Sequence, residues 1–130
     1  TCYEFLADTG GAGQFRGGMG VARDIQFLDQ SGMLNTQFDK FKVAPFGLFG
    51  GADGACGSLT LERQGEVVNL ASKTVNQDLR KGDIISMQTQ GGGGFGDPSK
   101  RDEQMVRRDL REGKVSPQCA QQNHGVGPKE

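Results

Sequence analysis

The stretch Gly91-Gly92-Gly93-Gly94-Phe95-Gly96-Asp97-Pro98 lies between a strand-like run, residues 84–89, and a charged segment of helical character. Glycine has no Cβ, so consecutive glycines allow the backbone to pass close to another segment of the chain. Fixing four glycines also costs conformational entropy, which favours leaving them mobile. The stretch alone is therefore compatible with a flexible linker or with a tightly packed backbone crossing.

Glycine is frequent elsewhere too, at 22 of 130 residues, with further dense segments at residues 10–20 and 47–57. This distribution favours an ordered run that packs against the other glycine segments. The expected consequence is that Gly93→Val disrupts assembly, whereas a flexible linker would tolerate the substitution. The glycines assigned a structural role are Gly91, Gly92, Gly93, Gly94 and Gly96.

Charge and composition exclude several classes of partner. The chain carries 15 basic and 16 acidic side chains, so it has no net field that would attract nucleic acid or an anionic membrane. No apolar run approaches the roughly 20 residues of a membrane span, and no signal peptide is visible. Leu, Ile, Val and Phe make up only about a fifth of the chain. We therefore expect the chain to need a partner surface to bury enough apolar area.

Cysteine usage and the first residue indicate the setting of the chain. Cys2, Cys56 and Cys119 are odd in number and widely spaced, so they predict no disulfide framework and a reducing, cytoplasmic compartment. The chain begins at Thr1 without methionine. It is therefore expected to be processed or to be cut from a longer polypeptide.

Hydrophobic patterning predicts an α+β fold that is mainly β, with residues 1–97 as a glycine-rich β portion. The clearest local prediction is a hairpin in which strands 58–63 and 66–70 flank the turn Gln64-Gly65. The remaining predictions are strands at 1–7, 21–28, 33–38, 40–43 and 84–89, an extended polar segment at 72–79, and turns at 29–32 and 80–83.

Residues 98–130 are predicted to form a tail with a short helical hairpin. Asp102 has the side chain of a helix N-cap, and Gly113 is placed to stop that first helix. Ser116, followed by proline, is predicted to cap a second helix that ends at Gly125.

Candidate chemistry is sparse. The spacing Gly91-x-Gly93-x-x-Gly96 formally matches a dinucleotide fingerprint, but Asp97-Pro98 stands where a helix N-terminus should receive the pyrophosphate. The single histidine, His124, lies in a polar segment and is expected to be exposed to solvent. The residues predict no catalytic group and no metal site in this chain, and they identify no cofactor-binding residue.

Two arginines are candidates for contact with an anion or for a structural contact. Arg16 is flanked by Phe15 and Gly17, so it could bind an anion or a carboxylate, or bridge backbone carbonyls among glycine loops. Arg23 falls on the apolar face of strand 21–28. It could lie past the rim of that face or point inward toward a partner carboxylate.

Five ordered segments carry a family resemblance. They are residues 9–18 (TGGAGQFRGG) continuing to Arg23, residues 45–51 (PFGLFGG), residues 72–73 with 79–83 (SK, LRKGD), residues 89–98 (TQGGGGFGDP) and residues 108–117 (RDLREGKVSP). Together they resemble the C-terminal part of the B-type subunit of the hydantoinase B/oxoprolinase family, a subunit several times longer than this chain. The sequence departs from the family pattern at Lys81 and Gln90, where the family usually has proline.

The resemblance implies the C-terminal chain of an ATP-dependent cyclic-amide hydrolase of the hydantoinase or 5-oxoprolinase type. Its implied partners are an ATP-binding hydantoinase A-type subunit and the remainder of a hydantoinase B-type subunit. The alternatives are a component of an ATP-dependent ketone carboxylase, of the acetone or acetophenone type, and a non-catalytic structural assembly module. The isolated chain is expected to be inactive.

The resemblance also implies ATP and a divalent metal in the full complex, neither of them bound by this chain. The family's His and Asp metal ligands lie in its N-terminal part, which this chain does not match. The implied fold is a barrel-like arrangement of β-sheets with polyproline-II-like segments, followed here by the helical hairpin.

Overall fold

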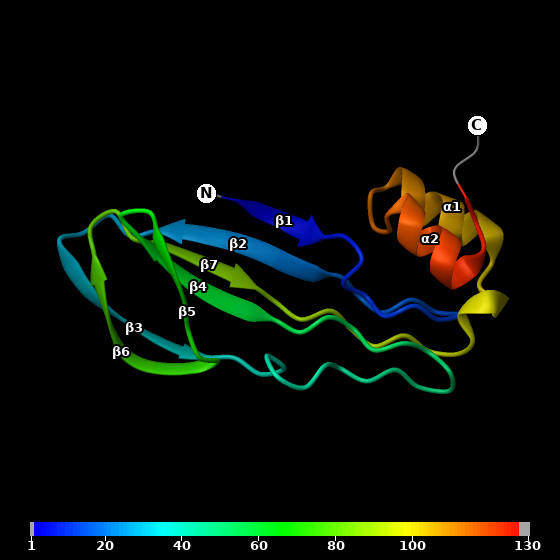
Figure 1. The fold of residues 1–130 in the computed structure, drawn as a ribbon, viewed down its shortest axis with the longest axis horizontal. Helices are drawn as coiled ribbons and strands as arrows, with labels where there is room; N and C mark the ends of the chain where they lie inside the picture. The colour runs from blue at the N-terminus through cyan, green and yellow to red at the C-terminus, as the bar shows by residue number, and fades with distance from the viewer. Residues whose placement is uncertain (1, 128–130) are drawn as a thin grey trace.

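The computed structural model describes residues 2–127, which form an elongated molecule with sheets at one end and helices at the other (Figure 1). The mainly β fold with a helical tail is confirmed; Thr1 and residues 128–130 lie outside the described residues. The strands are β1 (Tyr3–Leu6), β2 (Gly20–Gln26), β3 (Ser31–Gln37), β4 (Ser58–Arg63), β5 (Glu66–Asn69), β6 (Lys73–Arg80) and β7 (Ile84–Gln88). A 3₁₀ turn, η1 (Pro98–Lys100), precedes helices α1 (Glu103–Arg111) and α2 (Pro117–His124).

The strands form two open antiparallel sheets. The larger has the order β1-β2-β7-β4-β5, and β3 pairs with β6 in a separate two-stranded ribbon. Among the described strands these sheets do not close into a barrel. Irregular segments run side by side from the five-stranded sheet toward the helices, so they connect the two ends of the molecule (Figure 1).

Local turn chemistry explains the hairpin of β4 and β5. Gln64 and Gly65 have φ of +53° and +84°, as a two-residue type I′ turn requires. The register pairs Arg63 with Glu66 directly across the turn. The predicted hairpin is therefore confirmed.

The predicted strand at 40–43 is wrong. Lys40 has φ of +61°, which takes the chain out of the extended conformation after β3. Phe38 and Phe41, three residues apart, would point to opposite faces of a strand. The bend instead stacks their rings, with centroids 5.6 Å apart, against the main hydrophobic core. The buried members of that core are Leu59, Leu61, Leu79 and Ile85.

A buried carboxylate, Asp83, fixes the turn into β7. It accepts hydrogen bonds from Arg63 Nη2 at 2.7 Å and from the backbone N of Arg80 at 2.8 Å, and it is 2% exposed. The hydrogen bond from Arg63 holds the pKa of Asp83 below its ordinary value despite burial. The sheet end therefore depends on an ion pair that hydrophobic patterning does not predict.

Replacing Asp83 with asparagine is expected to lower the free energy of unfolding by about 2 kcal/mol, because Arg63 loses its charged acceptor. Urea unfolding followed by circular dichroism measures this. The control is Asp78→Asn, since Asp78 is exposed and its carboxylate lies 3.8 Å from Arg63 Nη2. Equal losses in the two variants would contradict the assigned role of Asp83.

The helical hairpin is confirmed with its capping residues. Asp102 accepts from Gln104 N at 2.8 Å, and Ser116 accepts from Cys119 N at 3.2 Å. Gly125 ends α2 with φ of +68°. The two helices enclose a second small core of Val106, Val115 and Ala120. Neither described helix has the length and apolar character needed to cross a membrane.

Candidate functional site

Three glycine-rich segments, residues 9–18, 45–57 and 91–96, pack side by side and are here called the glycine bundle. Each segment bonds to both others through the backbone. Gly92 N donates to Gly18 O at 2.8 Å, and Gly94 N donates to Ala52 O at 2.8 Å. Residues 9–18 and 45–57 also meet directly, because Ala52 N donates to Ala12 O at 2.7 Å.

Close backbone contact explains why the bundle consists of glycine. A Cβ on Gly93 would overlap the carbonyl of Phe46, and a Cβ on Gly94 would overlap the carbonyl of Ala12. Gly96 has φ of +75°, which side chains disfavour. The other bundle glycines whose Cβ would lie closer than 3.0 Å to backbone atoms are Gly10, Gly11, Gly13, Gly17, Gly47, Gly51, Gly54, Gly57 and Gly91. The run that begins at Gly91 is therefore an ordered backbone crossing rather than a linker.

The same hydrogen bonds argue against a phosphate-binding loop. A glycine loop cradles phosphate through free backbone N–H groups at the start of a helix. Here the N–H groups of Gly91, Gly92 and Gly94 already donate to carbonyls within the bundle. The segment continues into η1, a 3₁₀ turn of 3 residues, rather than into a helix.

Arg16, Arg101 and Asp109 form a buried ion cluster that joins the bundle to α1. Arg16 donates from Nε to Asp109 Oδ2 at 3.0 Å and from Nη2 to Oδ1 at 3.3 Å. Arg101 Nη2 donates to the same Oδ2 at 2.8 Å. The carboxylate thus receives a two-point contact from one guanidinium and a third bond from the other.

The arginines of the ion cluster also bond to the backbone. Arg16 Nη1 donates to Gly17 O at 2.8 Å, and Arg101 Nη1 donates to Gln14 O at 3.1 Å. Burial raises the pKa of Asp109, but the bonds and charges of Arg16 and Arg101 outweigh burial and hold that pKa below its ordinary value. Arg16 therefore contacts both a carboxylate and a glycine carbonyl, and its partner is a residue of the tail.

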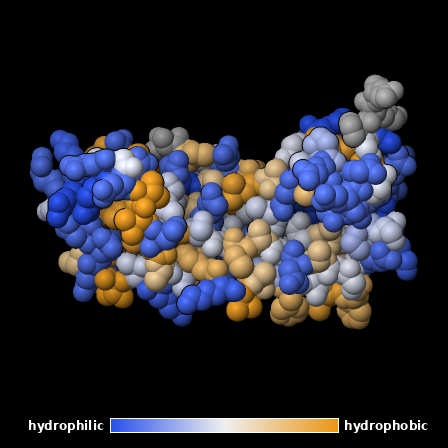
Figure 2. Space-filling view, in the orientation of Figure 1, coloured by the Kyte–Doolittle hydropathy of each residue, from blue (hydrophilic) through white to orange (hydrophobic). Residues whose placement is uncertain are grey.

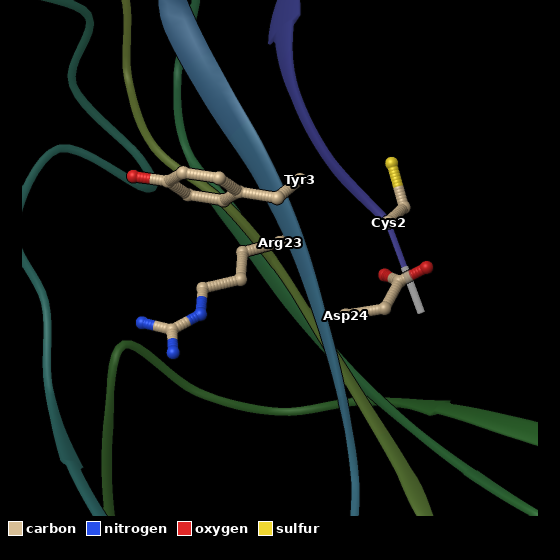
Figure 3. A pocket seen from close by; sticks show the side chains of 4 residues that line it. All are labelled: Cys2, Tyr3, Arg23 and Asp24. Carbon is tan, nitrogen blue, oxygen red and sulfur yellow. The ribbon is translucent and has the colours of Figure 1, made fainter.

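Arg23 lies apart from the ion cluster. It is exposed on β2, with its guanidinium 5.8 Å from the centroid of the Tyr3 ring. Arg23 and Tyr3 line an open pocket of about 490 Å³ together with Cys2 and Asp24 (Figure 3). In that view Arg23 and Asp24 point to opposite sides of β2, as neighbours on a strand do, so their charges do not converge on one point.

The thiol in this pocket is not activated. Burial and the neighbouring carboxylates of Glu4 and Asp24 raise the pKa of Cys2. The thiolate is the nucleophilic form, and a raised pKa disfavours it at neutral pH.

The expectation of a solvent-exposed His124 is wrong. The side chain is half-buried, and its Nδ1 donates to Pro98 O at 2.9 Å, which ties α2 to η1. It also lines a small pocket with Asp8 and Arg16. Within residues 2–127, no group of three or more His, Cys, Asp or Glu side chains is positioned to hold a metal ion. The described residues therefore do not fit the metal that the resemblance implies for the full complex.

Sequence reasoning missed two members of the ion cluster. Arg101 and Asp109 lie in a charged tail whose other ion pairs are exposed, such as Arg107 with Glu103. One signal was present, since Asp109 shares a helix face with the apolar Val106 and would face the protein.

The chain combines open sheets with the glycine bundle and with a tail that the ion cluster holds against this bundle. This combination is the basis for comparing the chain with known protein families. The chain belongs to the hydantoinase B/oxoprolinase family, whose sequence profile, described as Hydantoinase B/oxoprolinase, matches residues 1–98. The segments that carry the resemblance coincide with the bundle at residues 9–18, 45–51 and 91–96.

Two relatives and two solved structures illustrate the relationship. A 5-oxoprolinase from Dictyostelium discoideum is 37% identical over 89 residues, covering 68% of this chain and 7% of the relative. A caprolactamase subunit beta from Pseudomonas jessenii is 30% identical over 132 residues, covering 95% of this chain and 22% of the relative. The crystal structure of the ATP-dependent caprolactamase from Pseudomonas jessenii matches with a TM-score of 0.80 at 26% identity, over 98% of this chain and 23% of that one. A nucleotide-free acetone carboxylase structure matches with a TM-score of 0.79 at 20% identity, over 95% and 21%, which is a likeness of fold alone.

The chain spans about a fifth of the length of three relatives that it matches, including the caprolactamase subunit beta. It spans 7% of the length of the 5-oxoprolinase. Two of these relatives, the oxoprolinase and the caprolactamase, have the names of enzymes that act on cyclic amides. Among them, the caprolactamase is named as ATP-dependent and as having a subunit beta.

Proposed function

We propose that this chain is the C-terminal, glycine-rich part of a hydantoinase B-type subunit in an ATP-dependent cyclic-amide hydrolase. It works with an ATP-binding hydantoinase A-type subunit and with the remainder of the B-type subunit. The observation that carries the proposal is the match to the ATP-dependent caprolactamase over 98% of this chain at a TM-score of 0.80. The proposed location is the cytoplasm, in line with three free cysteines at Cys2, Cys56 and Cys119.

The part played by this chain is structural support for the site. Its bundle is held by backbone hydrogen bonds and its tail by the buried ion cluster, so it supplies a stiff element against which catalytic segments can be positioned. ATP and a divalent metal belong to the other parts of the complex. ATP would supply a phosphoryl group to the amide oxygen, which would make the amide carbon a better electrophile for water.

Two alternatives differ in what the complete enzyme does. A ketone carboxylase is favoured by the fold match to acetone carboxylase. A purely structural assembly module is favoured by the glycine bundle, which is held together by backbone hydrogen bonds. Product analysis separates them, because ring opening, carboxylation and the absence of turnover are distinct outcomes.

The isolated chain is expected to hydrolyse neither ATP nor a cyclic amide. The complete B-type subunit with its A-type partner is expected to open at least one of hydantoin, 5-oxoproline and caprolactam in an ATP-dependent manner. Phosphate release and mass spectrometry of the product measure both, and native mass spectrometry identifies the subunits present.

Turnover by the isolated chain would refute the proposed division of labour. ATP-dependent carboxylation of acetone by the complete complex, without ring opening, would replace the hydrolase with the carboxylase. A chain that neither associates with the remainder of the B-type subunit nor supports turnover would refute the family role altogether.

A further inference from the structure

An exposed apolar surface, here called the phenylalanine face, is formed by Phe15, Leu48, Phe49 and Phe95. These residues come from all three segments of the glycine bundle, and they are 59%, 49%, 79% and 45% exposed. The Phe95 ring touches both other rings, with centroids 5.1 Å from Phe49 and 6.2 Å from Phe15. Figure 2 shows hydrophobic surface along the lower edge of the molecule, beneath the irregular segments and on the opposite side from the helices. A cluster of contacting but exposed rings is typical of a protein interaction surface.

The backbone presents Phe49 to solvent at a conformational cost. Phe49 and Gly50 have φ of +51° and +93°, and Gly51 N donates to Leu48 O at 3.0 Å, which makes a type I′ turn. Asparagine and glycine suit the first central position of this turn, whereas a phenylalanine is strained there. The described chain gives little in return, because the ring remains 79% exposed. Strain of this kind is typical of functional positions.

The phenylalanine face is also rigid. Leu48 N donates to Gly94 O, and Gly96 N donates to Leu48 O, both at 2.9 Å. Phe15 and Phe95 exchange backbone hydrogen bonds of 2.9 Å in each direction. The backbone that carries the rings is therefore held in place before any partner binds, which lowers the entropic cost of an interface.

We propose that the phenylalanine face is covered by the remainder of the hydantoinase B-type subunit. This inference rests on the proposed function and names the surface through which the chain joins that subunit. The chain spans 22% of the caprolactamase subunit, so most of such a subunit is available to cover it. The four exposed side chains of the face are all apolar, as in the cores of permanent interfaces, whereas transient partners meet more polar surfaces.

Hydroxyl-radical footprinting read by mass spectrometry tests the occupant. The samples are the isolated chain, the complete B-type subunit, and that subunit with its A-type partner. Oxidation of Phe49 and Phe95 is expected to fall at least about fivefold from the isolated chain to the complete B-type subunit. Unchanged oxidation in the complete subunit overturns the inference, as does protection that appears only with the A-type partner. Protection that rises with the concentration of the isolated chain identifies a second copy as the occupant and also overturns it.

The substitution Phe49→Asn separates association from folding. Asparagine suits the type I′ turn, so the melting temperature of the isolated chain is expected to stay within about 4 °C of the wild type. Binding to the separately produced remainder of the subunit is expected to weaken at least about tenfold. Leu28→Asn is the matched control, because Leu28 is 72% exposed and lies outside the face.

Wild-type affinity in the Phe49→Asn variant overturns the inference and leaves the proposed function standing. An equal loss in the Leu28→Asn variant also overturns it, because the effect would then not be specific to this face. No association of the wild-type chain with the remainder refutes the proposed function itself.

Discussion

The substitution Gly93→Val is expected to lower the free energy of unfolding by at least about 4 kcal/mol, which is a large share of the total stability of a chain of this size. The new Cβ would overlap the carbonyl oxygen of Phe46 and approach Gly47 N at 3.0 Å. Backbone atoms cannot rotate away as a side chain can, so the two segments have to separate. Their separation breaks further bonds, including the one between Gly94 N and Ala52 O. Urea unfolding and the yield of soluble chain measure the effect.

A matched control lies in the same bundle. Gly18 is exposed, a Cβ added to it would meet no heavy atom within 4 Å, and its φ is not positive. Gly18→Val is therefore expected to change stability by less than about 1 kcal/mol. Equal stability of the two variants would mean that the run from Gly91 behaves as a linker after all.

Elements whose signals are local could be predicted from the sequence. The hairpin at Gln64-Gly65 depends on a two-residue turn, and the helices depend on caps at Asp102 and Ser116 that act within three residues. Strand β7 was recognisable from an apolar run bounded by turn residues. In each case the residues that decide the structure are neighbours in the sequence.

Long-range pairing could not be predicted. Arg16 and Asp109 are 93 residues apart, and neither the pattern near Arg16 nor that near Asp109 names the other. Patterning also missed the bend at Lys40, where packing of Phe41 on Phe38 overrides the extended preference of the segment. Composition did indicate that the glycine segments meet, but it gave no register between them.

The sequence predicted the contacts of the two candidate site residues to different extents. Arg16 was recognisable as an arginine among glycines, and the structure gives it both a carboxylate and a carbonyl as partners. For Arg23 the alternation left open a place past the rim of the face or an inward charge, and the side chain lies exposed beside Tyr3. The buried contacts of Arg16 and the exposed position of Arg23 can be distinguished only from the residues that surround each side chain in the structure.

The substitution Asp109→Asn is expected to lower the free energy of unfolding by about 3 kcal/mol. Asparagine keeps the shape of the side chain but removes the charge that neutralises Arg16 and Arg101. The side chains of Arg16 and Arg101 are 14% and 5% exposed, so solvent cannot replace the lost partner. The tail is expected to detach from the glycine bundle before the sheets unfold, because the cluster joins these two parts. Hydrogen exchange of α1 and α2 measures the detachment.

The pH dependence of the free energy of unfolding tests whether the Asp109 carboxylate is responsible for the loss of stability. The folded-state pKa of Asp109 is held low, so its contribution is full above its unfolded pKa near 3.9 and is lost as the pH falls through the folded value. The stability difference between wild type and Asp109→Asn is therefore expected to be constant from pH 7 to 5 and to narrow below pH 4. The control Glu103→Gln breaks an exposed pair with Arg107 and is expected to cost less than about 1 kcal/mol. A difference that stays constant down to pH 3, or a cost no greater than that of Glu103→Gln, would show that the ion cluster does not hold the tail.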